Sequence, residues 1–460
     1  MNLIFLLILL SMNLLMAVIG RIVANPHKNI ILETTLPKEH LQDSQVTQVR
    51  QTYKLRLIQT ALLFSLADLL ILFLPYDSLA MLFFLLSIFG LIGVMYFMQV
   101  LYVRRMTDVK IKNNWILPTK PLLIDTKLIQ NKNRRLIKPY WFIPGIVISF
   151  AGCLYTFFIL NSAIEVIIFG GISLITLGIF IYSYYLIRRL PVKPMTDDEQ
   201  INQQVNDAMR YYWSLLLISS VLVFSPLSFL PALSTQAAYE KTLYLVIAYF
   251  VLLFAYIGFI FFILFRLRKT QDNLIMQASD YRYGDEDQYW RYGIYINPDD
   301  PRIIIPDRLG MNMSVNLGRP AGKAAMILTS IIIVGALIIS CVPLLINDFS
   351  NDPFQLAISK TEVTMTAPFT RTREIPVTDI RSVQLVDKLP ENSIRIYGSA
   401  TEHYLTGEFR IADRPAYLLV YKNQQPLLKI ETLDYTYYYT NKESEKTTQL
   451  FKRLQNELNP

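Results

Sequence analysis

Hydrophobic and polar positions divide this 460-residue chain into two parts. Over roughly the first three quarters of the chain, long hydrophobic runs alternate with polar segments. A helix that crosses about 30 Å of hydrocarbon needs roughly 17 to 25 predominantly apolar residues, and eight runs meet this requirement. They predict a polytopic α-helical membrane protein with about eight transmembrane helices, at Leu3 to Ile19, Leu57 to Leu74, Leu79 to Val103, Trp141 to Leu160, Val166 to Ile187, Tyr211 to Ala232, Leu243 to Phe265 and Ala324 to Ile346.

The polar breaks between these runs indicate how the helices are connected. Three of the breaks are so short that they hold only a turn, which predicts three helical hairpins with a single helix at each end. Gln42 to Arg56 has apolar residues at helical spacing and predicts an amphipathic helix that leads into the second span. The acidic residues Asp197 to Glu199 predict the cap of a helix that carries Val205 and Met209 toward the sixth span.

The distribution of Lys and Arg predicts the orientation of the spans. Short loops that keep positive charge usually stay in the cytoplasm. The segment from Arg104 to Lys138 holds ten Lys and Arg against two Asp, and the loop from Arg21 to Arg56 is also positive. Basic residues also follow the fifth span (Arg188 and Arg189) and the seventh span (Arg266, Arg268 and Lys269). This pattern places four loops in the cytoplasm and both termini outside the cell. The first run could instead be a cleaved signal peptide, although Met1 and Asn2 supply no positive side chain ahead of it.

The C-terminal segment from Asn347 to Pro460 has the composition and hydrophobic pattern of a soluble β-rich domain. Short runs rich in β-branched and aromatic residues predict seven strands. Thr440 and Glu443 have capping-box spacing for a terminal helix. The chain therefore divides into helices 1 to 7 with their loops (1–265), a cytoplasmic loop module (266–323), an eighth helix (324–346) and an extracytoplasmic domain (347–460). The seven predicted strands are Leu356 to Thr366, Ser382 to Asp387, Ile394 to Gly398, Glu408 to Ile411, Tyr417 to Tyr421, Leu427 to Thr432 and Tyr435 to Thr440.

Several short motifs recur along this domain, at Ile375 to Ile380, Leu389-Pro390, Tyr397-Gly398, Gly407 to Phe409 and the final helix. Together they resemble the bacterial type of pleckstrin-homology-like (PH-like) domain. The resemblance implies a β-rich PH-like fold but no particular ligand, because fold alone does not determine function. Tyr435, Tyr437 and Tyr439 alternate on one face of the last strand, either as part of the core or as a candidate ligand-facing surface.

The loop module (residues 266–323) carries the most distinctive motif of the chain. Aromatic residues, Asx-Pro turns and short β-branched runs alternate there and predict a compact module of turns and strands. Its acidic residues, including Asp285 to Asp287, lack the alternating oxygen ligands of a calcium loop, and surface turns are the favoured interpretation. The candidate site residues of the module are Trp290, Gly293, Tyr295, Asn297, Pro298, Asp300 and Pro301. The motif that they form resembles a segment of uncharacterised membrane proteins of Gram-positive bacteria, which implies kinship more than chemistry.

Asp68 is the one acidic residue well inside a predicted span, near the middle of the second. Placing such a charge in a bilayer costs about 2.5–3.5 kcal/mol, so the side chain is expected to face the bundle interior or a wet cavity. Two interpretations stay open. Asp68 is either a structural group bonded to a neighbouring helix or the titrating carboxyl of a coupled transporter.

Composition narrows the function further. The chain is 53% hydrophobic and carries a net charge of +8, which the membrane segments and basic loops explain without a nucleic-acid partner. With three His and two Cys, and with no recognisable catalytic or metal motif, we expect no enzyme, no cofactor and no metal site. We expect a multi-pass protein of the bacterial cell membrane that senses, scaffolds or protects against antimicrobial peptides, with a peptide or protein partner outside the cell and an undetermined oligomeric state. The alternative is a small-solute or proton-coupled transporter that uses Asp68.

Overall fold

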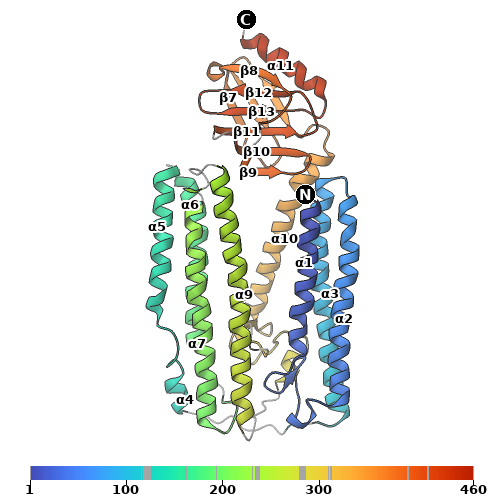
Figure 1. Ribbon diagram of the computed structural model, residues 1–460, viewed down its shortest axis with the longest axis vertical. Helices are drawn as coiled ribbons and strands as arrows, with labels where there is room; N and C mark the ends of the chain where they lie inside the picture. The colour runs from blue at the N-terminus through green and yellow to red at the C-terminus, as the bar shows by residue number, and fades with distance from the viewer. Residues whose placement is uncertain are drawn as a thin grey trace. The chain divides into compact units, whose positions relative to one another are not determined.

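The computed structural model (Figure 1) describes residues 2–115, 117, 126–160, 163–192, 194–230, 232–233, 239–278, 286–308, 310, 313–390, 393–411 and 414–458. The chain forms two compact units, each built from segments that are distant in sequence. Unit 1 comprises Met1–Val18, Ile58–Met95 and Met326–Pro460, and unit 2 comprises Ile19–Leu57 and Tyr96–Ala325. Several long helices begin in one unit and end in the other.

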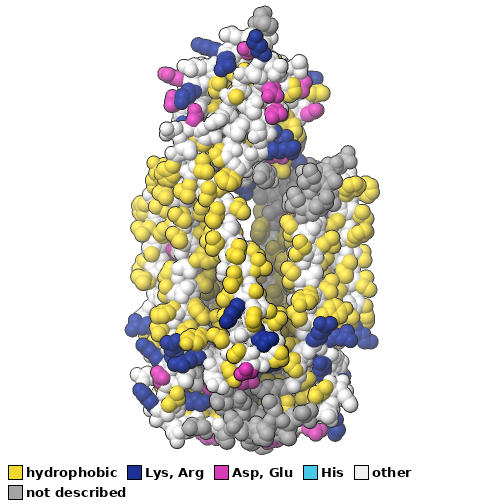
Figure 2. Space-filling view, turned by 180° about the vertical axis from the view of Figure 1, so that it is seen from behind, with side chains coloured by type: hydrophobic (Ala, Val, Ile, Leu, Met, Phe, Trp, Pro, Cys, Tyr) yellow, Lys and Arg dark blue, Asp and Glu magenta, His cyan; other side chains and the backbone are white. Residues whose placement is uncertain are grey.

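The described residues contain eight helices that are long and apolar enough to cross a membrane, which confirms the predicted number. On the face seen in Figure 2, hydrophobic side chains cover these helices, as contact with lipid requires. The α-helices before the C-terminal domain are α1 (Asn2–Gly20), α2 (Ser44–Asp68), α3 (Asp77–Lys112), α4 (Thr126–Asn131), α5 (Ile143–Leu160), α6 (Ala163–Arg189), α7 (Glu199–Phe224), α9 (Tyr239–Gln277) and α10 (Pro320–Phe349).

Two helices begin well before their hydrophobic runs, as the sequence predicted. Helix α2 starts at Ser44 and continues without a break into the second span. Helix α7 starts after Asp198, whose carboxylate accepts hydrogen bonds from the backbone N–H groups of Gln200 (2.7 Å) and Ile201 (3.0 Å). This cap satisfies two N–H groups that the first turn of a helix leaves without partners. The cap therefore sets the first turn of the helix that carries Val205 and Met209.

Within unit 2, α7 packs against both α6 and α9, and α5 packs against α6 (Figure 1). The connecting segments add two short antiparallel hairpins, β1 (Ile30–Ile31) with β2 (Thr34–Thr35), and β3 (Ile304–Pro306) with β4 (Met313–Val315). The second hairpin confirms that the loop module is built from turns and short strands.

The C-terminal domain of unit 1 is β-rich, as predicted, but its described residues form nine strands rather than seven. The run from Leu356 to Thr366 is two strands because Ser359 to Thr361 form a tight turn, and Arg373–Pro376 adds a strand that the prediction missed. The strands are β5 (Gln355–Ile358), β6 (Glu362–Thr366), β7 (Arg373–Pro376), β8 (Ser382–Val386), β9 (Ser393–Ala400), β10 (Tyr404–Ile411), β11 (Arg414–Tyr421), β12 (Leu427–Glu431) and β13 (Thr436–Tyr439), followed by helix α11 (Ser444–Leu458).

These strands form two sheets around one core. The order is β5-β6-β7 in the first sheet and β8-β12-β13-β11-β10-β9 in the second. Strand β11 pairs with β13 in parallel, and every other described pair in this domain is antiparallel. Buried side chains of both sheets, such as Val363 and Leu419, pack with Leu454 of α11. Leu344 of α10 belongs to the same core, so the domain is continuous with the end of this helix.

Candidate functional site

The first loop of unit 2 (residues 21–43) contains an unusual pair of consecutive tight turns. Lys28 and Asn29 form the first turn, with φ angles of 51° and 62°, and Leu32 and Glu33 form the second, with 48° and 56°. Two central residues with positive φ are typical of a type I′ hairpin turn, where Gly and Asn are preferred. Left-handed backbone costs most other residues about 1–2 kcal/mol each, and such strain gathers at functional sites.

Buried polar contacts with α9 hold the first turn in place. His27 Nδ1 lies 2.8 Å from a carboxylate oxygen of Asp272, and the backbone N–H of Lys28 donates to the same oxygen at 2.9 Å. Arg268 Nη2 donates to the carbonyl of Asn25 at 2.5 Å. Burial lowers the pKa of His27 to about 4 despite the opposing effect of Asp272. The ring is therefore neutral at pH 7, and the stability that this state contributes is lost as the pH falls from about 6.5 toward 4.

Asp287 joins three separate segments of unit 2. Lys110 Nζ of α3 and Arg308 Nη1 of the loop module each lie 2.7 Å from its carboxylate. Thr35 of the first loop donates to it through its backbone N–H at 3.2 Å and its hydroxyl at 2.9 Å. Burial alone would raise the pKa of Asp287, but Arg308 and Lys110 hold it below its usual value. Arg308 also donates to the backbone carbonyl of Glu33, which locks the second turn against the loop module.

Glu33 is a buried carboxyl beside this junction. Its side chain is 3% exposed, and its Oε2 atom has no hydrogen-bond partner among the described residues. Burial raises the pKa of Glu33 to about 7, although Arg308 acts in the opposite direction. A carboxyl whose pKa is raised on folding stabilises the fold most below its unfolded value of about 4.5. That stability falls as the pH rises through about 7.

Asn316 is the centre of the loop module. Its side-chain N–H groups donate to the carbonyls of Asn297 (2.8 Å), Asp300 (3.1 Å) and Arg302 (3.1 Å). Its Oδ1 accepts from the backbone N–H groups of Asn297 (3.0 Å) and Gly318 (2.9 Å). Asn316 is fully buried, so one amide satisfies backbone groups that no strand or helix pairs. A Cβ at Gly318 would lie 2.3 Å from the carbonyl carbon of Asn297, so only glycine permits this close approach.

The structure brings most of the predicted motif residues together around this centre. Trp290 and Tyr295 pack with their ring centroids 5.2 Å apart. The Tyr295 hydroxyl donates to Asp300 at 3.0 Å and accepts from the side-chain amide of Asn297 at 3.1 Å. Arg302 binds Asp300 with Nε at 2.9 Å, and this side-chain hydrogen bond is the main reason that the pKa of Asp300 is lowered to about 2.

The remaining motif residues shape the backbone of the module. Gly293, with φ of 68°, closes the turn in which its N–H donates to the carbonyl of Trp290 at 2.8 Å. The carbonyl of Pro298 accepts from Arg319 at 3.2 Å, and Pro301 follows Asp300 directly. Asp287 and Asp300 are largely buried and bound by basic side chains, so the interpretation of these acidic residues as surface turns is wrong for both. Asp285 lies outside the described residues.

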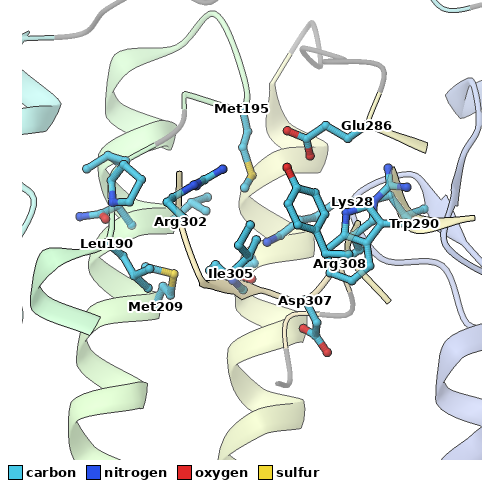
Figure 3. Close-up of a pocket in the computed structure, with 18 of the residues that line it drawn as sticks. Lys28, Leu190, Met195, Met209, Glu286, Trp290, Arg302, Ile305, Asp307 and Arg308 are labelled. Carbon is cyan, nitrogen blue, oxygen red and sulfur yellow. The ribbon is translucent and has the colours of Figure 1, made fainter. Parts of the chain in front are cut away.

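A cavity of about 200 Å³ lies among these segments, entirely within unit 2 (Figure 3). Its walls come from the first loop, the segment that precedes α7, the first turns of α7, the end of α9 and the loop module. Residues of three kinds line it. The charged residues include Lys28, Glu286, Arg302, Asp307 and Arg308, the polar residues include Gln271, Asn202 and Asn206, and the apolar residues include Leu190, Met195, Val205, Met209, Trp290 and Ile305.

Lys28 and Gln271 line the cavity and have unused hydrogen-bonding capacity within the described structure. The Lys28 ammonium forms no hydrogen bond with the described residues, and its charge has only the more distant carboxylates of Asp272 and Asp307 to offset burial. Burial lowers the pKa of Lys28 to about 8, so most of the side chains still carry a charge at pH 7. Gln271 is 2% exposed, and its Oε1 atom has no partner among the described residues. The cavity therefore offers one free cationic donor and one free acceptor.

Asp68 lies in unit 1 and belongs to a closed polar cluster. One of its oxygens accepts from Asn13 Nδ2 of α1 at 2.7 Å, and the other accepts from Ser87 Oγ of α3 at 2.5 Å. Asn13 also donates to Ser65 at 3.0 Å, and Asp68 is fully buried. The prediction that Asp68 lies mid-helix is wrong, because α2 begins earlier and ends at Asp68, where a 3₁₀ turn continues to Phe73. This geometry matches the structural interpretation of Asp68.

The tyrosines proposed as a surface of the C-terminal domain lie in its core. Tyr437 and Tyr439 are 9% and 1% exposed, and both pack in the main hydrophobic cluster, while Tyr435 packs against its edge. The Tyr439 hydroxyl donates to the carbonyl of Phe354 at 2.9 Å. The candidate surface is therefore wrong for Tyr437 and Tyr439, because β13 lies between β11 and β12 and α11 and the first sheet cover this face.

Sequence reasoning missed the residues that complete the site. Lys28 and Gln271 are single polar residues more than 200 positions apart, and no spacing rule connects them. Asp287 stood within an acidic group that resembled a surface turn. Asn316 had a detectable signal, because an Asn two residues before a Gly is suited to satisfying the backbone groups of a turn.

Comparison with known proteins gives one partial match. A family model described as a family of unknown function, DUF5808, matches residues 298–323, which hold Asp300, Arg302, Asn316 and Gly318. No curated protein matches the chain, and no solved structure matches it. The matched segment is thus the part of the loop module that Asn316 organises, together with the start of α10, and the chain is similar to this family over that segment.

Proposed function

We propose that this protein is a non-catalytic receptor of the bacterial cell membrane whose ligand binds in the unit 2 cavity. The observation that carries the proposal is the free ammonium of Lys28, held on a strained turn at the wall of a preformed cavity. Lys28 is half-buried, and its ammonium has no hydrogen-bond partner within the described structure, so it can bind a group that a ligand supplies. Strained backbone that aims a charged side chain into a cavity is a common property of binding sites.

The lining suits binding better than catalysis. Thr35, the lining hydroxyl nearest to a carboxylate, already donates to Asp287. The charged side chains Arg302 and Arg308 are fixed by Asp300 and Asp287, so they shape the wall and do not exchange protons near pH 7. What is left is a cationic donor, an amide acceptor and several apolar side chains. This combination recognises a polar group attached to an apolar one.

The C-terminal β-rich domain is the output part of the proposed receptor. Helix α10 begins at Pro320, in the last residues of the loop module, and ends at Phe349, six residues before β5. At 1.5 Å per residue its 30 residues extend about 45 Å, enough to cross a bilayer. We infer from the basic loops that the domain lies outside the cell. There it would act in envelope sensing, scaffolding or peptide immunity, in line with its PH-like sequence motifs.

The test uses the full-length protein extracted from its own membrane. Native mass spectrometry is expected to detect a small molecule that co-purifies with the wild type and is lost from Lys28→Gln and from Val205→Trp, which fills the cavity. Lys112→Gln, at an exposed site at the end of α3, is the matched control and should retain the molecule. Equal retention by all four proteins, or no co-purifying molecule in the wild type, would count against the proposal.

A further inference from the structure

Resting on the proposed function, we infer that the ligand is a phospholipid whose headgroup carries hydrogen-bond donors in addition to its phosphate. Such headgroups end in hydroxyls, as in phosphatidylglycerol, or in a primary ammonium, as in phosphatidylethanolamine. Phosphatidylcholine has a phosphate but no such donor. The inference follows from three features: the size of the cavity, its apolar wall along α7, and the unused hydrogen-bonding groups of Lys28 and Gln271.

The size of the cavity fits a headgroup and excludes a whole lipid. Sites that enclose a complete small molecule usually measure about 300–1,000 Å³. At about 200 Å³, this cavity encloses a smaller polar group and leaves any attached chain outside. The ligand is therefore expected to be amphiphilic, with one end bound and the other end in a different environment.

The apolar wall provides a path from the cavity to the membrane. Val205 and Met209 are four residues apart on α7 and share one face of the helix. The sixth membrane span begins with this helix at Glu199 and ends at Phe229, in the 3₁₀ segment that follows α7. Figure 3 shows Leu190 and Met209 together on the α7 side of the cavity and Lys28, Trp290 and Arg308 on the opposite side. An acyl chain can follow the α7 side while the headgroup faces Lys28.

The cationic side of the cavity matches a phosphate. The Lys28 ammonium has three donors and no partner among the described residues. Phosphate oxygens accept several hydrogen bonds at once, and charge-assisted bonds from Lys and Arg are the strongest of these.

The acceptor side of the cavity demands a donor from the same ligand. The unpartnered Oε1 of Gln271 is buried, and a ligand that offers no N–H or O–H group leaves it unsatisfied. A site built to hydrogen-bond a ligand donor discriminates strongly against an analogue that lacks it. Phosphatidylcholine is such an analogue.

The experiment measures binding to full-length protein in detergent micelles by native mass spectrometry. The probes are phosphatidylglycerol, phosphatidylethanolamine and phosphatidylcholine with identical acyl chains, and sn-glycerol 3-phosphate as a free phosphate ester. We expect the first two lipids to bind at least tenfold more tightly than phosphatidylcholine, and the free ester not to compete. Gln271→Leu should reduce this preference to less than threefold. Lys28→Gln should lower the affinity for all three lipids at least tenfold, and Lys112→Gln should leave every affinity unchanged.

The pH dependence gives a readout that a folding defect does not produce. Binding to the wild type should weaken above about pH 8, where Lys28 loses its proton. Lys28→Arg keeps its charge and should bind equally from pH 7 to pH 9.5. Equal affinity of the wild type for all three lipids, with Lys28→Gln still deficient, would overturn the headgroup inference and keep the proposed function. Competition by the free ester would overturn the lipid assignment, and lipid binding that is independent of both Lys28 and Val205 would overturn the site itself.

Discussion

Replacing Asn316 with Ala tests whether one side chain holds the loop module together. The substitution removes five hydrogen bonds from a fully buried position. The backbone N–H groups of Asn297 and Gly318 lose their acceptor, and three carbonyls lose a donor. The cavity left by the amide is small, so the unsatisfied backbone groups dominate the effect.

The magnitude follows from the two orphaned N–H groups. A buried donor without a partner costs about 1–3 kcal/mol, and carbonyls lose less because each has a second lone pair. The local opening free energy of the module should therefore fall by about 3 kcal/mol, which corresponds to roughly a hundredfold faster exchange of the protected amides. Asn316→Asp should be at least as disruptive at pH 7, because it keeps the acceptor oxygen but sets a carboxylate against three carbonyls.

Hydrogen exchange with mass spectrometry on the full-length protein in micelles measures this directly. Peptides that contain Asn297 and Gly318 should exchange faster in Asn316→Ala, while peptides of β10 and β11 should not change. Asn441→Ala is the matched control. Asn441 is 4% exposed and donates to Asp352 at 2.6 Å, so its loss should affect the C-terminal domain and leave the loop module protected. Less than a threefold change in the loop module of Asn316→Ala would refute the reasoning.

Three further predictions address charge and topology. Glu33→Gln should raise the melting temperature at pH 8 and leave it nearly unchanged at pH 5, because a pKa of about 7 instead of 4.5 corresponds to about 3 kcal/mol of destabilisation at high pH; equal melting at both pH values would argue against it. Asp68→Asn should lower thermal stability by about 1–2 kcal/mol without releasing the co-purified ligand, and ligand loss would restore the transporter interpretation. Ser444→Cys, in a chain lacking Cys153 and Cys341, should react with an impermeant maleimide on intact cells; labelling only after permeabilisation would reverse the topology.

The transmembrane helices were predictable because the membrane imposes a simple rule. A segment in hydrocarbon must satisfy its own backbone and present apolar side chains, so its length and composition are visible in one stretch of sequence. The start of α7 was predictable for a similar reason, since Asp198 caps the helix through contacts two and three residues away. Asp68 was correctly singled out, but its partners Asn13 and Ser87 depend on how three helices pack.

The β-rich domain was predicted in kind but not in detail. Alternating and aromatic runs identify strands, yet the parallel pairing of β11 with β13 joins segments that the intervening β12 separates in sequence. This pairing buries Tyr437 and Tyr439, which the strand pattern alone allowed to face either the core or a ligand. Which face of a strand is buried depends on the elements that pack on that face. In this domain, α11 and the first sheet pack on the face of β13 that carries Tyr437 and Tyr439.

By itself, the sequence determined the membrane class, the eight spans, the basic loops and the existence of an irregular motif between Trp290 and Pro301, because each depends on residues close together in the chain. Only the tertiary structure decided the site. Lys28 becomes a candidate ligand contact because a strained turn, anchored by Asp272, directs it into a cavity with Gln271. A lone lysine in a basic loop carries no such signal, since burial and the absence of a partner are properties of the surroundings that folding assembles.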